Sequence, residues 1–170
     1  MTELSTYYLN LKNKFKMLRF IKTDSSNSDF QSLVAMLNQG LVVTDGDEFE
    51  FFAQFNKLDS IKNVLVAYNE VNEAVGCGAF KEYAPNVAEI KRMFVQEQYR
   101  GRRIAAQILD LLEEWAFEMG YKVCILETSV ALPSAVRLYE REGYNRIGNY
   151  GQYIGVASSI CMSKNIKNQK

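Results

Sequence analysis

The stretch that most constrains this chain runs from Glu89 to Met119, and it reads as a buried strand, a basic turn and a long amphipathic helix. In the helical part, apolar residues recur every three or four positions, which predicts one apolar face directed at a core. These residues are Ile104, Ile108, Leu111, Leu112, Trp115 and Met119. The predicted polar face is Gln107, Asp110, Glu113, Glu114 and Glu118, and Gly120 is a helix stop signal.

The turn before this helix, Tyr99–Ala106, carries three arginines and a glycine. The first turn of a helix leaves backbone N–H groups unpaired, and with the helix dipole these groups form an anion site. Guanidinium groups nearby suit phosphate oxygens. From the turn alone, a pyrophosphate cradle and a solvated basic surface are equally compatible with the residues.

Composition narrows the chemistry that the chain can perform. Lysine plus arginine and aspartate plus glutamate balance at 20 each, so no overall charge favours a nucleic acid or a membrane surface as partner. The chain has no histidine, which excludes Ser-His, Cys-His and His-metal sites, and we expect no metal. Acid and base roles must then fall to carboxylates, tyrosine, lysine or water.

Three cysteines and the N-terminal sequence bear on the compartment. Cys77, Cys124 and Cys161 are odd in number and lie in apolar surroundings, which is typical of buried free thiols in a reducing compartment. No apolar run reaches membrane-spanning length, and residues 1–17 lack the apolar stretch of a signal peptide. We therefore expect a cytoplasmic protein with one domain over residues 1–170, in which residues 1–16 are peripheral and 164–170 frayed.

Apolar periodicity and turn residues predict the remaining elements. A capping box Ser28-x-x-Gln31 opens a helix that Gly40 should stop, and an aromatic helix should follow over Asp47–Lys57. Gly76 and Gly78 lie inside a strand, where they favour a bulge or close packing. Pro133 should begin a last helix that Gly143 ends. The predicted strands are 17–22, 64–68, 74–80, 87–95, 122–128, 144–147 and 157–162.

Because strands 87–95 and 122–128 flank the long helix, they should form a parallel pair with a right-handed crossover. The expected fold class is therefore α/β, with a mixed, mostly antiparallel sheet, one parallel strand pair and helices on both faces.

Val95–Leu109 resembles the acyl-CoA loop of the GNAT superfamily of N-acetyltransferases, written R/Q-x-x-G-x-G/A. Here the motif runs from Arg100 to Ala105, with Arg103 in place of the first motif glycine. We expect Arg103 to be helical, a conformation in which arginine is well tolerated. The resemblance covers residues 18–163, most sharply 89–144, and implies the GNAT fold and acetyl-CoA as cofactor. It assigns cofactor contacts to Met93, Phe94, Val95, Arg100, Gly101, Arg102, Arg103, Ile104, Ala105 and Ala106.

The same resemblance assigns the catalytic groups. Tyr139, in a sequence similar to the LYxxxGF/Y signature, would protonate the leaving thiolate, since a phenol stays protonated at neutral pH. Glu127 and Glu89 match base positions of different members, and the spacing to Tyr139 favours Glu127. Each glutamate can also be an ordinary strand residue in a salt bridge.

The leading hypothesis is an acetyl-CoA-dependent N-acetyltransferase that acts on a primary amine of a small molecule or peptide by direct attack in a ternary complex. Two departures from the family pattern motivate an alternative, a non-catalytic acyl-CoA-binding sensor. Arg103 replaces a motif glycine, and Leu132 stands where asparagine is frequent in the family. Candidate substrate contacts are Phe52, Tyr150 and Tyr153, whose rings can meet an amine through cation–π contact. The edges of the last strands leave a homodimer open.

Overall fold

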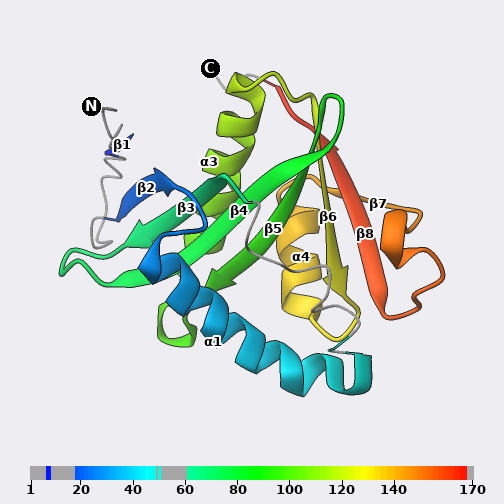
Figure 1. The fold of residues 1–170 in the computed structure, drawn as a ribbon, viewed down its shortest axis with the longest axis horizontal. Coiled ribbons are helices and arrows are strands. Elements are labelled where there is room, and N and C mark those ends of the chain that lie inside the picture. Colours follow the sequence, from blue (N-terminus) through cyan, green and yellow to red (C-terminus); the bar gives the residue numbers. More distant parts are fainter. Residues whose placement is uncertain (1–6, 9–17, 49, 51–60, 168–170) are drawn as a thin grey trace.

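The structure is a computed structural model that describes residues 7–8, 18–48, 50 and 61–167. One mixed sheet has the strand order β1-β2-β3-β4-β5-β6-β8-β7 (Figure 1). Its strands are β1 (Tyr7–Tyr8), β2 (Arg19–Thr23), β3 (Asn63–Tyr68), β4 (Ala74–Ala84), β5 (Val87–Val95), β6 (Val123–Ser129), β7 (Asn145–Ile147) and β8 (Ser159–Asn165). The helices are α1 (Ser28–Asp45), α3 (Ile104–Glu118) and α4 (Pro133–Arg141), with the short 3-10 helices η1 (Gly46–Glu48), η2 (Glu97–Tyr99) and η3 (Gly151–Tyr153).

The predicted fold class is confirmed. The pairs β1–β2, β2–β3, β3–β4, β4–β5, β6–β8 and β7–β8 are antiparallel, whereas β5 and β6 run parallel. Helix α3 connects these two parallel strands, as the order strand, helix, strand had predicted.

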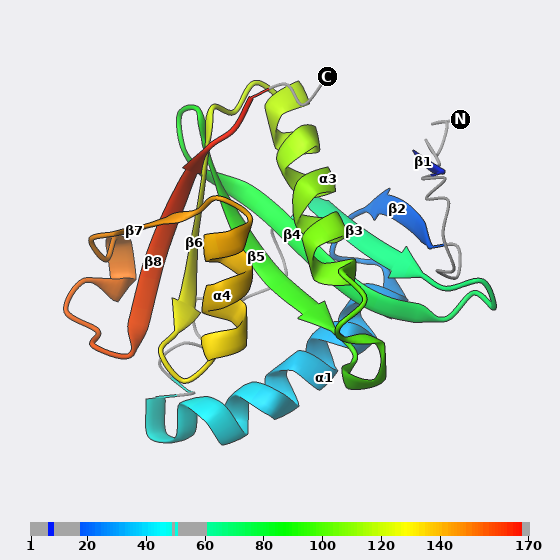
Figure 2. The ribbon, with the colours of Figure 1, turned by 180° about the vertical axis from the view of Figure 1, so that it is seen from behind.

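Helices cover both faces of the sheet. Helices α3 and α4 lie on one face and α1 crosses the other, as the two opposite views show (Figures 1 and 2). On the α3 side the core includes Ile108, Leu109 and Leu112 together with Phe80 and Leu126. On the α1 side a second core is built from Phe30, Leu33, Val34, Val64, Val66 and their neighbours. Burial of these apolar side chains is the main source of stability.

The parallel pairing of β5 and β6 is short, and this determines where a site can form. It holds only at Val87–Val123, Ala88–Cys124 and Glu89–Ile125, after which the two strands diverge (Figure 2). Residues 90–95 and 126–129 therefore continue without pairing to one another. A strand edge without a partner carries backbone groups that a ligand can pair with.

A β-bulge in β5 lies at this divergence. Cys77 pairs with Phe94 and Ala79 pairs with Lys91. Between these two pairs β5 advances by three residues while β4 advances by two, so β5 contains one extra residue. Arg92, inside the bulge, has φ +58°. Gly78 faces the bulge, and a Cβ there would lie 2.5 Å from Met93 Sδ. The prediction that Gly76 and Gly78 serve a bulge and close packing is thus confirmed.

Several predicted details were wrong. Helix α1 continues past Gly40 to Asp45, because a glycine without strain in a helix lowers stability but does not break it. Its cap is Asn27, whose Oδ1 accepts from Phe30 N at 2.9 Å, and not Ser28. Strand β8 extends to Asn165, so Lys164 is not frayed.

On α3, the predicted polar face includes one residue that is buried. Glu113 is 1% exposed because Lys164 of β8 forms an ion pair with it, whereas Met119 of the predicted apolar face is 53% exposed. The aromatic helix expected over 47–57 lies mostly outside the described residues. None of the helices in the described part is both long and apolar enough to cross a membrane.

Candidate active site

The turn before α3 is shaped by two residues with positive φ. Gly101 has φ +76° and Arg103 has φ +59°, in the left-handed region. The prediction that Arg103 is helical was therefore wrong: Arg103 is the N-cap of α3 and the helix begins at Ile104. A non-glycine residue in this region costs about 1–2 kcal/mol. Arg103 therefore adopts a conformation that glycine tolerates better, at the position of the first motif glycine.

The three arginines of the turn have different surroundings. Arg100 Nε donates to the Val95 carbonyl oxygen at 3.0 Å, so this side chain fixes the turn to the end of β5. Arg102 donates to the Gln98 carbonyl oxygen and lies over the Tyr99 ring. Arg103 is exposed and lies 4.0 Å from a Glu142 carboxylate oxygen. Arg102 and Arg103 thus supply positive charge at the surface of the turn.

The residues of this turn fit a pyrophosphate group. Arg103 makes no side-chain capping hydrogen bond, so no side chain of the cap occupies the first N–H groups of α3. Open space surrounds Gly101, because a Cβ there would meet no atom within 4 Å. Free N–H groups, a helix N-terminus and two guanidiniums together form an anion site. We call residues 100–106 the cradle.

A cleft opens where β5 and β6 diverge. Its walls come from both strands, from α1 and from α4, and they are Leu37, Leu41, Ile90, Lys91, Arg92, Met93, Glu127, Thr128, Ser129, Leu132, Ala135 and Tyr139. Two of the three predicted catalytic residues, Glu127 and Tyr139, therefore line one cleft. They come from different elements, β6 and α4.

Tyr139 is suited to hold a proton. Its side chain is 7% exposed and packs edge-on against Tyr144. Burial and the charge of Glu127 raise the pKa of Tyr139 above its ordinary value. The phenol therefore remains protonated throughout the neutral range and can act as a hydrogen-bond donor or an acid.

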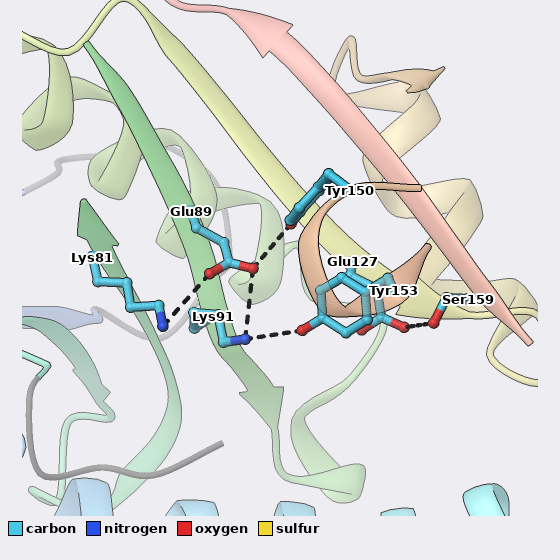
Figure 3. A network of polar contacts seen from close by, with 7 residues as sticks. All are labelled: Lys81, Glu89, Lys91, Glu127, Tyr150, Tyr153 and Ser159. Carbon is cyan, nitrogen blue, oxygen red and sulfur yellow. Dashed lines mark hydrogen bonds and ion pairs between the residues drawn. The ribbon is translucent and has the colours of Figure 1, made fainter. Parts of the chain in front are cut away.

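Glu127 is positioned on the α1 side of the sheet. Ser159 Oγ, from β8, donates to Glu127 Oε1 at 2.7 Å (Figure 3). This hydrogen bond orients the carboxylate, and the cleft gives it access to a ligand. A carboxylate held in this way can accept a proton directly or through one water molecule.

Glu89, the second predicted base, has a different environment. It is 2% exposed and is not among the residues that line the cleft. Tyr150 donates to Glu89 Oε1 at 3.0 Å, and Lys91 and Lys81 form ion pairs at 3.6 and 3.8 Å (Figure 3). Glu127 therefore lines the cleft, whereas Glu89 is held by two lysines and Tyr150 and is not among the lining residues.

The two predicted substrate-contact tyrosines belong to this same network. Lys91 Nζ donates to the Tyr153 hydroxyl at 3.2 Å, and the Tyr150 and Tyr153 rings pack edge-on (Figure 3). Phe52 lies outside the described residues. Sequence reasoning gave no role to Lys91 or Ser159. Their positions beside Tyr153 and Glu127 follow from how the strands of the sheet are paired.

The described residues contain no group of three or more potential metal-ligating side chains. Among these residues, the polar groups of the cleft are carboxylate, phenol, hydroxyl, ammonium and guanidinium groups. Such a set can bind anions and move protons.

Comparison with known proteins identifies relatives of this chain. The chain is 35% identical over 91 residues to an IAA acetyltransferase of Azospirillum brasilense, an alignment that covers 53% of this chain and 60% of that protein. The chain spans 54–66% of the length of the first curated relatives.

Solved structures share the fold. An acyl-CoA N-acyltransferase of Klebsiella pneumoniae superposes with a TM-score of 0.73 at 24% identity, over 87% of this chain and 97% of that one. A Bacillus anthracis acetyltransferase in complex with acetyl coenzyme A gives a TM-score of 0.55 at 21% identity, over 67% and 68% of the two chains. The sequence profile described as the acetyltransferase (GNAT) family matches residues 30–144, and the chain belongs to this family.

Proposed function

We propose that this protein is an acetyl-CoA-dependent N-acetyltransferase that acts on a primary amine by direct attack in a ternary complex. The observation that carries the proposal is the divergence of β5 and β6, with Glu127 and Tyr139 in the cleft and the cradle beyond the end of β5. When bound, acetyl-CoA supplies the activated acetyl thioester. Family membership and the acetyl-CoA complex of the related Bacillus anthracis fold support this choice of cofactor.

The cradle would hold the pyrophosphate. Its Ile104, Ala105 and Ala106 N–H groups lie in the first turn of α3, with Arg102 and Arg103 alongside. Residues 93–95 form the strand edge next to the cleft and would pair with the pantetheine arm. A backbone N–H group at Met93 or Phe94, beside the bulge, would stabilise negative charge that develops on the acyl oxygen.

Glu127 would take a proton from the acceptor. An alkylamine has a pKa of about 10.4, so at pH 7 the neutral form costs roughly 4–5 kcal/mol, and a base in the cleft lowers this cost. Tyr139, protonated because its pKa is raised, would hold the proton that the leaving group requires. Glu89 would act indirectly, through Lys91 and Tyr150.

The proposal is tested by binding and by turnover. Titration calorimetry should show micromolar acetyl-CoA binding, and a panel of amines should then give release of free thiol. Absence of acetyl-CoA binding would refute the proposal. Binding without thiol release over a broad panel of amines and amino acids would instead support a sensor module that binds acyl-CoA.

A further inference from the structure

The bulge in β5 places two cationic residues in succession beside the part of the cleft where the acceptor would bind, which we call the acceptor side. In a regular strand, neighbouring side chains point to opposite faces, and a bulge breaks this alternation. Here Lys91 contacts Tyr153, and Arg92 Nη1 donates to Asn38 Oδ1 of α1 at 3.0 Å. Both side chains line the cleft. The α1 face of β5 therefore presents an ammonium and a guanidinium group at adjacent positions.

Lys91 retains capacity for a ligand. It is 9% exposed, and its ammonium has three N–H donors. The hydrogen bond to Tyr153 uses one donor, and the 3.6 Å ion pair with Glu89 uses at most one more. Glu89 is also shared with Lys81, 3.8 Å away, so two lysines face one carboxylate there (Figure 3). A buried cation in such a position is stabilised by a further anion.

The other walls of the cleft match the remaining parts of an amphoteric ligand. Glu127, the carboxylate that lines the cleft on β6, would meet an amine, and Lys91 lines the same cleft. Leu37 and Leu41 of α1 form an apolar wall on the same side. The cleft thus combines a site for an amine, a site for an anion and an apolar surface.

We propose that the acceptor is an amino acid with an apolar side chain, whose carboxylate binds Lys91 and Arg92 while its amine faces Glu127. The apolar side chain would lie against Leu37 and Leu41. This inference rests on the proposed acetyl transfer and adds the substrate class to it. It makes Lys91 a residue that selects the substrate.

Three related probes test the inference: leucine, leucinamide and 3-methylbutylamine. They share the amine and the apolar group, and carry a carboxylate, a neutral amide of nearly the same shape, and no such group, respectively. Their binding is measured by calorimetry, with the protein alone and saturated with coenzyme A. We expect leucine to bind at least tenfold more tightly than the other two. Equal or weaker binding of leucine, or no leucine binding at millimolar concentration, would overturn the proposal whether or not acetyl-CoA binds.

Variants assign the preference to Lys91. Lys91→Met should reduce the preference for leucine to less than threefold, whereas Lys91→Arg should retain it. Lys81→Met is the matched control, since it also removes one partner of Glu89 but does not line the cleft. A preference that survives in Lys91→Met, or that is lost equally in Lys81→Met, would refute the role of Lys91. The ranking of probes by the unaltered protein remains decisive if Lys91→Met does not fold.

The proposed function and the proposed substrate class can be refuted independently of one another. A protein that binds acetyl-CoA and acetylates 3-methylbutylamine as well as leucine would keep the proposed function and refute the substrate class. A protein that prefers leucine but binds no acetyl-CoA would refute the proposed function alone.

Discussion

The cradle and the acceptor side of the cleft lie along one divergence between two strands, but they are built from different materials. The cradle is a continuous stretch, residues 100–106, and it uses backbone N–H groups and exposed arginines. The acceptor side uses buried and half-buried side chains from β5, β6, η3 and β8, joined by hydrogen bonds and ion pairs. Changes in the cradle should therefore alter affinity, and changes on the acceptor side should alter turnover.

The largest effect is expected at the proposed base. Glu127→Gln keeps the shape of the side chain and its hydrogen bond to Ser159 but removes the proton acceptor. Turnover at saturating amine should fall about a thousandfold, within the range of general base catalysis. Acetyl-CoA affinity, measured by calorimetry, should stay unchanged.

The control for this variant is Glu114→Gln, on the exposed side of α3. Activity lost equally in both variants would indicate a general effect of carboxylate removal. If Glu127→Gln retained full turnover and Glu89→Gln did not, Glu89 would replace Glu127 as the base.

The next effect is expected at Tyr139. Tyr139→Phe removes only the hydroxyl group, and turnover should decrease about a hundredfold because the leaving group loses its acid. Since burial and Glu127 raise the Tyr139 pKa, the unaltered enzyme should show no loss of activity from Tyr139 ionisation as the pH rises to 9. A decrease in turnover around pH 8 that is present in the unaltered protein and absent from Tyr139→Phe would contradict this assignment. Unchanged turnover in Tyr139→Phe would exclude the acid role.

The contrast between a continuous stretch of chain and a site assembled from distant strands also explains what could be predicted from the sequence. Strand, turn and helix over Glu89–Met119 are local, and apolar periodicity determined them well. The parallel pair followed from the order of the elements alone. The roles of Glu127 and Tyr139 came from family resemblance, and the fold brings both residues to one cleft.

Long-range contacts account for what sequence reasoning missed. Glu113 occupies a helix position that periodicity assigns to solvent, and its ion pair with Lys164, 51 residues further along the chain, makes its burial tolerable. The two glycines predicted a bulge, but only the pairing of β4 with β5 shows that Arg92 lies inside it, next to Lys91. Arg103 is helical by propensity, yet the turn imposes the left-handed conformation of a glycine on it. For Glu113 a tertiary contact overrides the local preference, and for Arg103 the turn does.

On the cradle, a change of charge should affect binding more modestly. Arg102→Glu reverses one exposed charge beside the proposed pyrophosphate, and the Kd for acetyl-CoA should rise about tenfold, or roughly 1.4 kcal/mol. The effect should shrink in high salt, because exposed charges are screened. Turnover at saturating acetyl-CoA should not change.

Lys122→Glu provides the control for Arg102→Glu. It makes the same change of charge at an exposed position just before β6, at the end of the parallel pair that lies away from the cleft. An equal loss of affinity in both variants would mean that net charge, and not the cradle, determines binding.

The smallest effect concerns the strain stored in the cradle. Arg103→Gly places the residue that tolerates positive φ at the position where φ is +59°. Part of the gain is offset by the greater freedom of glycine in the unfolded chain, so the free energy of unfolding should rise by about 0.5–1 kcal/mol. Arg102→Gly, at a neighbouring position without positive φ, should lower it instead. Denaturant unfolding of both variants measures the difference. A stabilisation that appears in neither variant would show that Arg103 occupies this conformation without strain, and the cradle would then owe its shape to the arginine itself.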